Sequence, residues 1–389
     1  MHAKNWYNWS GAQHHSGVQV ESPDSIEKIA RLVKHCSGAS RQLRCVGSGH
    51  SFNPFWTDDV ILSLDNIQGL VSVDINAATA KIRAGTKIHT LGPLLWDAGL
   101  SLPQQGDIDR QSLAGALSTG THGTGVELRS MPNSIVAITL VTANGEILEI
   151  SNTQNQEIFH FARISLGVLG VVTDITLKLQ PAFYLHEKNW QGDWSECESR
   201  YERMIDENRH FEFFWAPNTD IFTFKTLNPT QEPKQIIDTG EYIGPAYEVF
   251  PSERENKFNE MEYAVPFEQG WQCFCELREM LLREFPGLPW PIEYRTMAAD
   301  NLPLSTAYQR KVVTLSIHQG AERSHKKLFS AAESIFERYS ARPHWGKVHG
   351  LKKVELAELY PKFDAFCSVR TRLDAQGLFL NPYLFELFC

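Results

Sequence analysis

Small residues crowd one stretch of the chain, residues 104–125, which reads QQGDIDRQSLAGALSTGTHGTG. Glycine lacks a Cβ, so the backbone at these positions can come very close to a ligand. The serine and threonine hydroxyls and free backbone N–H groups of such a segment suit a pyrophosphate. A second cluster, GSGHSF at residues 47–52, lies in the same half of the sequence. Two such clusters in one domain predict a large anionic cofactor.

The segment GSGHSF begins like the dinucleotide fingerprint GxGxxG but does not complete it. Phe52 stands at the third glycine position, and the following NPFWTDD cannot open a helix. A Rossmann fold needs both features, so a Rossmann site is disfavoured here. Taken alone, the segment could also be a tight turn that ends a strand and carries an incidental histidine.

Composition and charge exclude several classes of protein. A hydrophobic fraction of 42% and 10 tryptophans are typical of a globular enzyme. The formal charge of -9, with no long Lys/Arg run, makes nucleic acid an unlikely partner. The seven cysteines form no CxxC with a matching pair, which favours reduced thiols. No secretory leader or apolar stretch of membrane-spanning length occurs, so we expect a cytoplasmic protein.

Metal chemistry is not expected from the sequence. His14 and His15 are adjacent on a polar segment, where solvated side chains are more common than ligands. No HExxH motif occurs.

The first half alternates short strands with helices. Ser25 can cap a helix whose apolar residues follow helical spacing from Ile26, and strands are expected near residues 41–46, 59–64, 70–75 and 79–85. Residues 88–100 look helical, with Pro93 expected to begin the main helix. Asn144-Gly145 predicts a β-hairpin with a type I′ turn, which requires positive φ at both residues.

The composition changes near Pro181, where we place a domain boundary. Aromatic strand-like segments at residues 210–227 and 290–297 and a helical segment at 267–285 predict an α+β domain. Residues 228–256 are polar and punctuated by proline and glycine, and are interpreted as a long loop or lid.

Taken together with GVLGVVTDITL at residues 167–177 and RPHWGK at 342–347, the glycine clusters resemble the vanillyl-alcohol oxidase superfamily of flavoproteins, in its aldonolactone and alditol oxidase branch. The resemblance implies an α+β fold. Residues 1–180 would form an FAD-binding domain of the PCMH type with two subdomains. Residues 181–335 would form an α+β cap with an antiparallel sheet, and residues 336–389 would return to the flavin.

His50 matches the histidine that relatives retaining it bond covalently to the flavin 8α-methyl group. Gly47 and Gly49 would then let the loop bring His50 against the ring. Other relatives lack the histidine and bind FAD non-covalently. The resemblance implies FAD contacts from Val46, Gly47, Ser48, Gly49, His50, Ser51, Gly106, Asp107, Ser112, Gly115, Ala116, Thr119, Gly120, Thr121, His122, Gly123, Gly125, Val171, Val172, His344 and Lys347.

Two neighbouring positions bear on the acceptor and the substrate. Gly106 matches a position beside the reactive face of the flavin that is glycine or alanine in the branch, and glycine would leave room for dioxygen. This favours an oxidase over a dehydrogenase. Asp107 stands where alditol oxidases have a serine that touches the polyol, which favours a lactone as substrate.

Four further residues are candidates for catalysis. Glu293 and Arg295 are two residues apart, a spacing that points both to one face of a strand. A surface ion pair is the alternative, but the cap sheet of the family carries a Glu-x-Arg facing the flavin. Arg295 would bind and polarise the substrate hydroxyl, with Glu293 orienting it. Lys347 would position substrate or stabilise reduced flavin, and His318 could face the same pocket or lie in the core.

These features predict an FAD-dependent enzyme that oxidises a CH–OH group of a sugar-1,4-lactone. Hydride would pass to flavin N5 and electrons to dioxygen, giving hydrogen peroxide. The alternatives are an alditol oxidase, a lactone dehydrogenase that uses another acceptor, and a flavin- or sugar-binding protein without turnover. The general base and the oligomeric state are left open.

Overall fold

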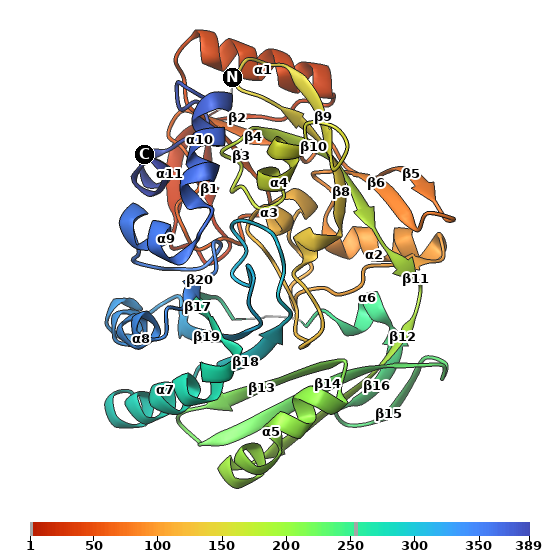
Figure 1. The fold of residues 1–389 in the computed structure, drawn as a ribbon, viewed down its shortest axis with the longest axis vertical. Coiled ribbons are helices and arrows are strands. Elements are labelled where there is room, and N and C mark those ends of the chain that lie inside the picture. The colour runs from red at the N-terminus through yellow and green to blue at the C-terminus, as the bar shows by residue number, and fades with distance from the viewer. Residues whose placement is uncertain (1–2, 253–255) are drawn as a thin grey trace.

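The computed structural model describes residues 3–252 and 256–389. Figure 1 shows an upper part with two sheets and both chain ends, and a lower part built on one large sheet. In the upper part, the first sheet has the order β1-β2-β4-β3. Its strands are β1 (Ala3–Tyr7), β2 (His14–Glu21), β3 (Leu43–Val46) and β4 (Val60–Ser63).

The helix predicted from Ile26 is α1 (Ile26–Gly38), and two strands that were not predicted precede it. The Ser25 side chain caps it by accepting a hydrogen bond from the Lys28 amide at 3.3 Å. Ile29, Val33 and Cys36 form its buried stripe, so the helix packs by the spacing that predicted it.

The second sheet is antiparallel, with the order β5-β6-β10-β8-β9. Its strands are β5 (Leu70–Asp74), β6 (Thr79–Arg83), β8 (Ile135–Val141), β9 (Ile147–Ser151) and β10 (Val171–Lys178). The connections carry α2 (Ile88–Asp97), α3 (Leu113–Ser118), the 3-10 turn η1 (Met131–Ser134) and α4 (Gln156–Ala162). A short ladder of β7 (Leu100–Ser101) with β11 (Gln180–Pro181) lies where the chain passes to the lower part.

The predicted hairpin β8–β9 is confirmed, but the prediction of its turn type was wrong. Only Gly145 has a positive φ, of 82°, whereas a type I′ turn also needs one at Asn144. The Gly145 amide donates to the Thr142 carbonyl at 2.8 Å, and the Asn144 side chain accepts from the Glu146 amide at 3.0 Å. These two hydrogen bonds, one of them to a side-chain acceptor, stabilise a longer turn that does not need two left-handed residues.

The expectation that Pro93 begins a helix was also wrong, because Pro93 lies inside α2. Gly92 marks a close contact instead. A Cβ there would lie 2.7 Å from the Cβ of Tyr247, which belongs to α6 (Ala246–Val249). The Gly-Pro pair therefore serves the packing of α2 against the lower part.

The lower part is a nine-stranded antiparallel sheet of order β15-β16-β12-β14-β13-β18-β19-β17-β20. Its strands are β12 (Tyr184–Gly192), β13 (His210–Ala216), β14 (Ile221–Thr230), β15 (Gln235–Asp238), β16 (Glu241–Pro245), β17 (Phe258–Pro266), β18 (Ile292–Met297), β19 (Val312–Gly320) and β20 (Arg342–Pro343). Helices α5 (Trp194–Glu207), α7 (Gly270–Glu284), which follows the turn η2 (Phe267–Gln269), and α8 (Lys326–Arg338) cover the face that points away from the upper part (Figure 1).

The interpretation of residues 228–256 as a loop or lid was wrong over most of its length. It contains the end of β14, then β15, β16 and α6, while residues 253–255 lie outside the described part. β16 pairs with β12, matching Leu185 to Gly244, so long-range ladder bonds override a turn-like composition.

The last part of the chain returns to the upper half, as α9 (Lys353–Leu359), α10 (Phe363–Leu373) and α11 (Pro382–Phe388) (Figure 1). The buried Arg44 guanidinium donates to the Phe379 carbonyl at 2.7 Å and to the Leu166 carbonyl at 2.8 Å. Burial lowers its pKa to about 10. This contact joins the C-terminal segment to the strand that precedes the His50 loop.

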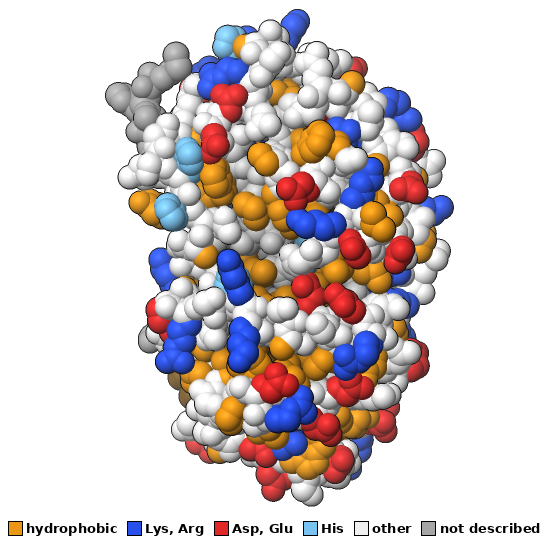
Figure 2. All heavy atoms as spheres, turned by 90° about the vertical axis from the view of Figure 1, so that its left-hand side faces the viewer, with side chains coloured by type: hydrophobic (Ala, Val, Ile, Leu, Met, Phe, Trp, Pro, Cys, Tyr) orange, Lys and Arg blue, Asp and Glu red, His pale blue; other side chains and the backbone are white. Residues whose placement is uncertain are grey.

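The surface fits the charge argument made from the sequence. On the face in Figure 2, basic and acidic side chains are interspersed, with no continuous basic tract. Among the described residues, no helix is both long enough and apolar enough to span a membrane.

Candidate active site

Two adjoining cavities lie where the glycine clusters approach the nine-stranded sheet. The larger has an empty volume of about 1040 Å³ and the smaller of about 530 Å³. Gln111 lines both, which makes them neighbours. The larger cavity is bordered by the two upper sheets and the smaller by β17, β18 and β19.

Most of the predicted cofactor and catalytic residues line one of these two cavities. The larger is lined by Val46, Gly47, Ser48, Gly49, His50, Ser51, Ser112, Gly115, Ala116, Thr119 and Val172. The smaller is lined by Gly106, Asp107, Thr121, His122, Glu293, Arg295, His318, His344 and Lys347. Gly120, Gly125 and Val171 line neither, and Gly123 lines a third cavity of about 260 Å³ beside Asp107.

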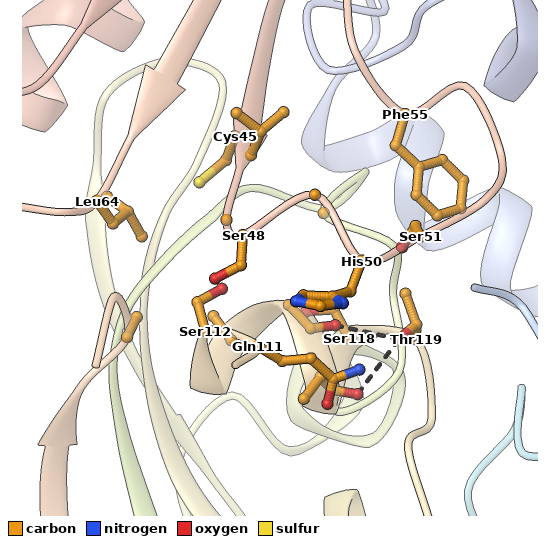
Figure 3. Close-up of a pocket in the computed structure, with 18 of the residues that line it drawn as sticks. Cys45, Ser48, His50, Ser51, Phe55, Leu64, Gln111, Ser112, Ser118 and Thr119 are labelled. Atoms are coloured by element: carbon orange, nitrogen blue, oxygen red, sulfur yellow. Dashed lines mark hydrogen bonds between the residues drawn. The ribbon is translucent and has the colours of Figure 1, made fainter. Parts of the chain in front are cut away.

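Gly47 lets two loops approach each other closely. A Cβ at Gly47 would lie 2.0 Å from the Ser112 Oγ, so the two glycine clusters touch at this point. Figure 3 shows the Ser48 and Ser112 hydroxyls facing each other there. Gly49 is needed for its φ of 69°, a left-handed conformation that other residues adopt at a cost. The sequence interpretation gave both glycines the same purpose, whereas they have different ones.

The His50 loop offers free donors to its cavity. Among the described residues, the backbone N–H groups of Ser48, Gly49, His50 and Ser51 donate to no other group of the protein. Residues 48–51 are half-buried and line the larger cavity, so a ligand there can reach these donors. They are therefore suited to the phosphate oxygens of a ligand.

His50 projects into the larger cavity above Gln111 and Thr119 (Figure 3). The Thr119 hydroxyl donates a hydrogen bond to the Gly115 carbonyl at 3.1 Å. Burial, with Lys347 and Lys87 adding repulsion, lowers the pKa of His50 to about 4. The imidazole is thus neutral near pH 7, which leaves one ring nitrogen with a free lone pair.

At the end of the second glycine cluster, Gly123 and Gly125 pack against other parts of the protein and do not line the larger cavity. A Cβ at Gly123 would lie 2.4 Å from the Gln105 carbonyl oxygen, and one at Gly125 would lie 2.6 Å from the Arg209 carbonyl oxygen. The Gly125 amide donates to the Thr296 carbonyl at 2.9 Å. Gly123 thus allows close packing within the upper part, whereas Gly125 joins the upper part to β18 and to the residue before β13.

Arg295 is the centre of the smaller cavity. Its guanidinium lies 2.5 Å from Glu262 and 3.2 Å from Glu293, and all three are buried. The prediction that Glu293 and Arg295 share a strand face is confirmed, and a surface ion pair is excluded. Glu262 also accepts from the Ser316 hydroxyl at 2.9 Å.

Glu293 stands out among these acids. Burial raises its pKa to about 8, even though Arg295 opposes the shift. One of its carboxylate oxygens, Oε1, has no hydrogen-bond partner among the described residues. Raised carboxyl pKa values and unpartnered polar atoms are features of functional sites.

Lys347, His318 and His344 also line the smaller cavity. Lys347 pairs with Glu260 and lies 5.3 Å from the Phe52 ring centre. The His318 Nδ1 lies 2.8 Å from the Pro291 carbonyl oxygen, and its Nε2 lies 3.8 Å from Glu260. Burial lowers the pKa of His344 to about 3, so this ring is neutral. Of the two positions left open for His318, pocket or core, it therefore takes the pocket.

Several residues of the site were missed from the sequence. Glu260 and Glu262 lie two apart on β17, with the same one-face spacing that identified Glu293 and Arg295, so the signal was present. Glu212 and Lys225 come from β13 and β14, lie 3.0 Å apart, and line the third cavity. Three groups of acids and histidines come close enough to hold a metal, yet the cations Arg295, Lys347 and Lys225 already lie against their carboxylates.

Comparison with known proteins defines the class first. A family model described as an FAD binding domain matches residues 19–151, and one described as D-arabinono-1,4-lactone oxidase matches residues 175–241 and 234–387. The protein is thus an FAD-binding oxidoreductase. It belongs to the D-arabinono-1,4-lactone oxidase family.

Individual relatives agree with this assignment. The L-gulono-1,4-lactone dehydrogenase of Mycobacterium tuberculosis is 34% identical over 420 residues, covering 97% of both chains. The L-gulonolactone oxidase of Scyliorhinus torazame is 28% identical over 429 residues, covering 98% of this chain and 97% of its own. Cholesterol oxidase from B. sterolicum has a TM-score of 0.87 at 15% identity, covering 100% of this chain and 97% of its own. This last likeness concerns the fold, and it confirms the predicted α+β architecture.

The larger cavity fits FAD on its own chemistry. Its backbone amides at residues 48–51 and the close-packed glycine clusters that border it suit the pyrophosphate of FAD. Gln111 lines this cavity and the smaller one that holds the acids and cations.

Proposed function

We propose that this protein oxidises a CH–OH group of a sugar-1,4-lactone and passes the electrons to dioxygen. The observation that carries the proposal is the set of Arg295 and three glutamates, all buried, with the half-buried Lys347, in a cavity that adjoins the proposed FAD cavity. Alternating donors and acceptors match the hydroxyl groups of a sugar, and membership of the D-arabinono-1,4-lactone oxidase family supports the lactone class.

FAD, when bound, supplies the acceptor for a hydride and for its electrons. Arg295 binds the hydroxyl oxygen of the substrate and stabilises the negative charge that develops there, because its fork of N–H donors is fixed by Glu262 and Glu293. Lys347, held by Glu260, positions a second substrate oxygen. His318 and His344 line the same wall and complete the contacts.

We further propose that FAD is covalently attached through His50. The neutral imidazole, with its pKa near 4, and its projection into the FAD cavity support this assignment. Acid denaturation tests it, because covalently bound flavin stays with the precipitated protein. Release of all the colour from a fully loaded sample would refute the attachment.

Dioxygen is proposed as acceptor because of Gly106. The Cβ of an alanine there would lie 3.1 Å from both the His122 carbonyl oxygen and the Thr121 methyl group, so glycine leaves open a space that alanine would fill. That space lies in the smaller cavity, within reach of a gas molecule.

The proposal is tested by screening the flavin-loaded protein with gulono-, galactono- and arabinono-1,4-lactones beside xylitol and sorbitol. Peroxide release and dye reduction are measured separately. We expect lactone-dependent peroxide, and we expect Arg295→Met to lower kcat/KM at least about 100-fold, the loss usual for a key charge-stabilising donor. Arg338→Met, at an exposed pair with Glu276, is the matched control. Bound flavin that no lactone or polyol bleaches anaerobically would refute an enzyme.

A further inference from the structure

The turn between β1 and β2 lies directly against the His50 loop. The Trp9 amide donates to the Gly49 carbonyl at 2.7 Å, and the Asn8 side chain donates to the Ser51 carbonyl at 3.1 Å. A Cβ at Gly49 would lie only 3.2 Å from the Asn8 Cα. The loop that carries His50 is thus fixed on both sides of the histidine by one neighbouring turn.

The Trp9 side chain contacts the imidazole itself. The two rings are stacked, with centroids 5.6 Å apart and planes inclined by 25°. Trp9 also meets Phe258 edge-on at 5.0 Å. The indole therefore contacts both His50 and the first residue of β17, and it restricts rotation of the imidazole about its side-chain bonds.

The turn is anchored to the lower part as well. Asn8 and Ser10 are only 3% and 6% exposed, so their polar groups must be paired inside the protein. The Ser10 hydroxyl bonds the Asn259 side chain at 3.2 Å, and the Asn8 side chain bonds the Ser10 hydroxyl at 3.1 Å. The turn that carries Trp9 is thus hydrogen-bonded both to the His50 loop and to the strand that carries Glu260 and Glu262.

We propose that Trp9 is a positioning residue that holds the His50 imidazole in the orientation needed for attachment to the flavin. The inference rests on the proposed covalent link and assigns a residue to its formation. A stacked aromatic face fixes the plane of the imidazole, and so it fixes the direction of the ring nitrogen toward the 8α carbon.

The attachment itself balances without any further reactant from the protein. A bond forms between an imidazole nitrogen of His50 and the 8α-methyl carbon, while one C–H bond of the methyl group and the imidazole N–H bond break. The two protons and two electrons released reduce the isoalloxazine. Dioxygen, the acceptor proposed above, takes them up as hydrogen peroxide and restores the oxidised ring.

The test follows attachment over time rather than turnover. Wild type, Trp9→Phe, Trp9→Leu, Trp9→Ala and His50→Ala are each incubated with excess FAD, and two quantities are measured: total bound flavin and the flavin retained after acid precipitation. Tyr7→Ala is the matched control, because Tyr7 is an aromatic residue of the same hairpin that is 57% exposed and stacks on His14 rather than on the loop.

We expect Trp9→Ala and Trp9→Leu to bind FAD but attach it at least about tenfold more slowly, in line with the sensitivity of reactions to misplacement. Trp9→Phe and Tyr7→Ala should attach it at close to the wild-type rate. Attachment at the wild-type rate in both Trp9→Ala and Trp9→Leu overturns the positioning role. Loss of bound flavin in both also overturns it, since Trp9 would then act on the fold. Complete release of flavin from wild type refutes the link at His50 itself, a result separate from these.

Discussion

Replacement of Glu262 provides a sharp test of how the substrate cavity is charged. Glu262 faces three donors: its Oε1 lies 2.9 Å from His122 Nε2, and its Oε2 lies 2.5 Å from Arg295 and 2.9 Å from the Ser316 hydroxyl. The other nitrogen of His122 lies 2.8 Å from the Gly123 carbonyl oxygen. The His122 ring therefore lies between the Glu262 carboxylate and the Gly123 carbonyl oxygen.

This geometry predicts different results for two substitutions of Glu262. In Glu262→Gln, the amide oxygen can still accept from Arg295 and Ser316, and the amide nitrogen takes the place of the oxygen beside His122. The negative charge disappears, but the donors of Arg295 and Ser316 keep an acceptor. We expect a loss of about 1 kcal/mol, the scale of one modified hydrogen bond. Glu262→Ala strands the same donors, and we expect a loss of about 3–5 kcal/mol, as for a broken buried ion pair.

Denaturant unfolding of the FAD-loaded protein at pH 7 measures the two losses. We expect Glu262→Ala to lose clearly more free energy of unfolding than Glu262→Gln. Equal destabilisation by both substitutions would refute the role of Glu262 as the acceptor shared by these donors.

Three further outcomes follow from the same geometry. With the pKa of His50 near 4, attachment of FAD at pH 5.5 should stay within about twofold of the rate at pH 8, whereas a histidine of ordinary pKa would slow roughly tenfold. Glu293, whose pKa rises from 4.5 to about 8 on folding, holds an extra proton in the native state between those values, so stability falls as pH rises. The free energy of unfolding, measured in urea, should therefore rise for Glu293→Gln relative to wild type by up to about 1.4 kcal/mol per pH unit from pH 5.5 to 7.5. A difference between the two proteins that does not change with pH would contradict this. Gly106→Ala should slow peroxide release more than dye reduction, and equal slowing would remove the basis for an oxygen space at Gly106.

The features that sequence predicts well are those set by local chemistry. The period of two on a strand was sufficient to place Glu293 and Arg295 on one face, and it would have found Glu260 and Glu262 had it been applied to β17. The glycine clusters likewise located the FAD cavity, because close backbone approach depends on the absence of a Cβ.

Other features depend on which distant segments meet, and no local pattern encodes that. His122 and Glu262 are 140 positions apart, and the link from Ser10 to Asn259 spans 249. Trp9 could not be assigned for the same reason, since its role depends on stacking against His50. Long-range pairing also made strands of the segment interpreted as a lid, where composition favoured turns.

The pairing of charges in the site bears on which form of the sugar can bind. Lys347, Arg295 and Lys225 each already lie against a glutamate: Lys347 on Glu260, Arg295 on Glu262, and Lys225 on Glu212 at 3.0 Å. An aldonate, the open-chain acid formed when a lactone hydrolyses, would bring one more buried carboxylate. It would meet cations that already have partners, and burying such a charge is costly.

A neutral lactone avoids this cost, because its hydroxyl groups can accept from the cations and donate to the carboxylates at once. We therefore expect the enzyme to turn over lactones while the matching aldonates neither react nor compete at tenfold excess over the lactone KM. Inhibition assays with freshly dissolved lactone and fully hydrolysed acid measure this. Competitive inhibition by the aldonate with an inhibition constant near the lactone KM would mean that a cation of the cavity releases its carboxylate when substrate binds. The pairing of charges would then not explain a preference for lactones over aldonates.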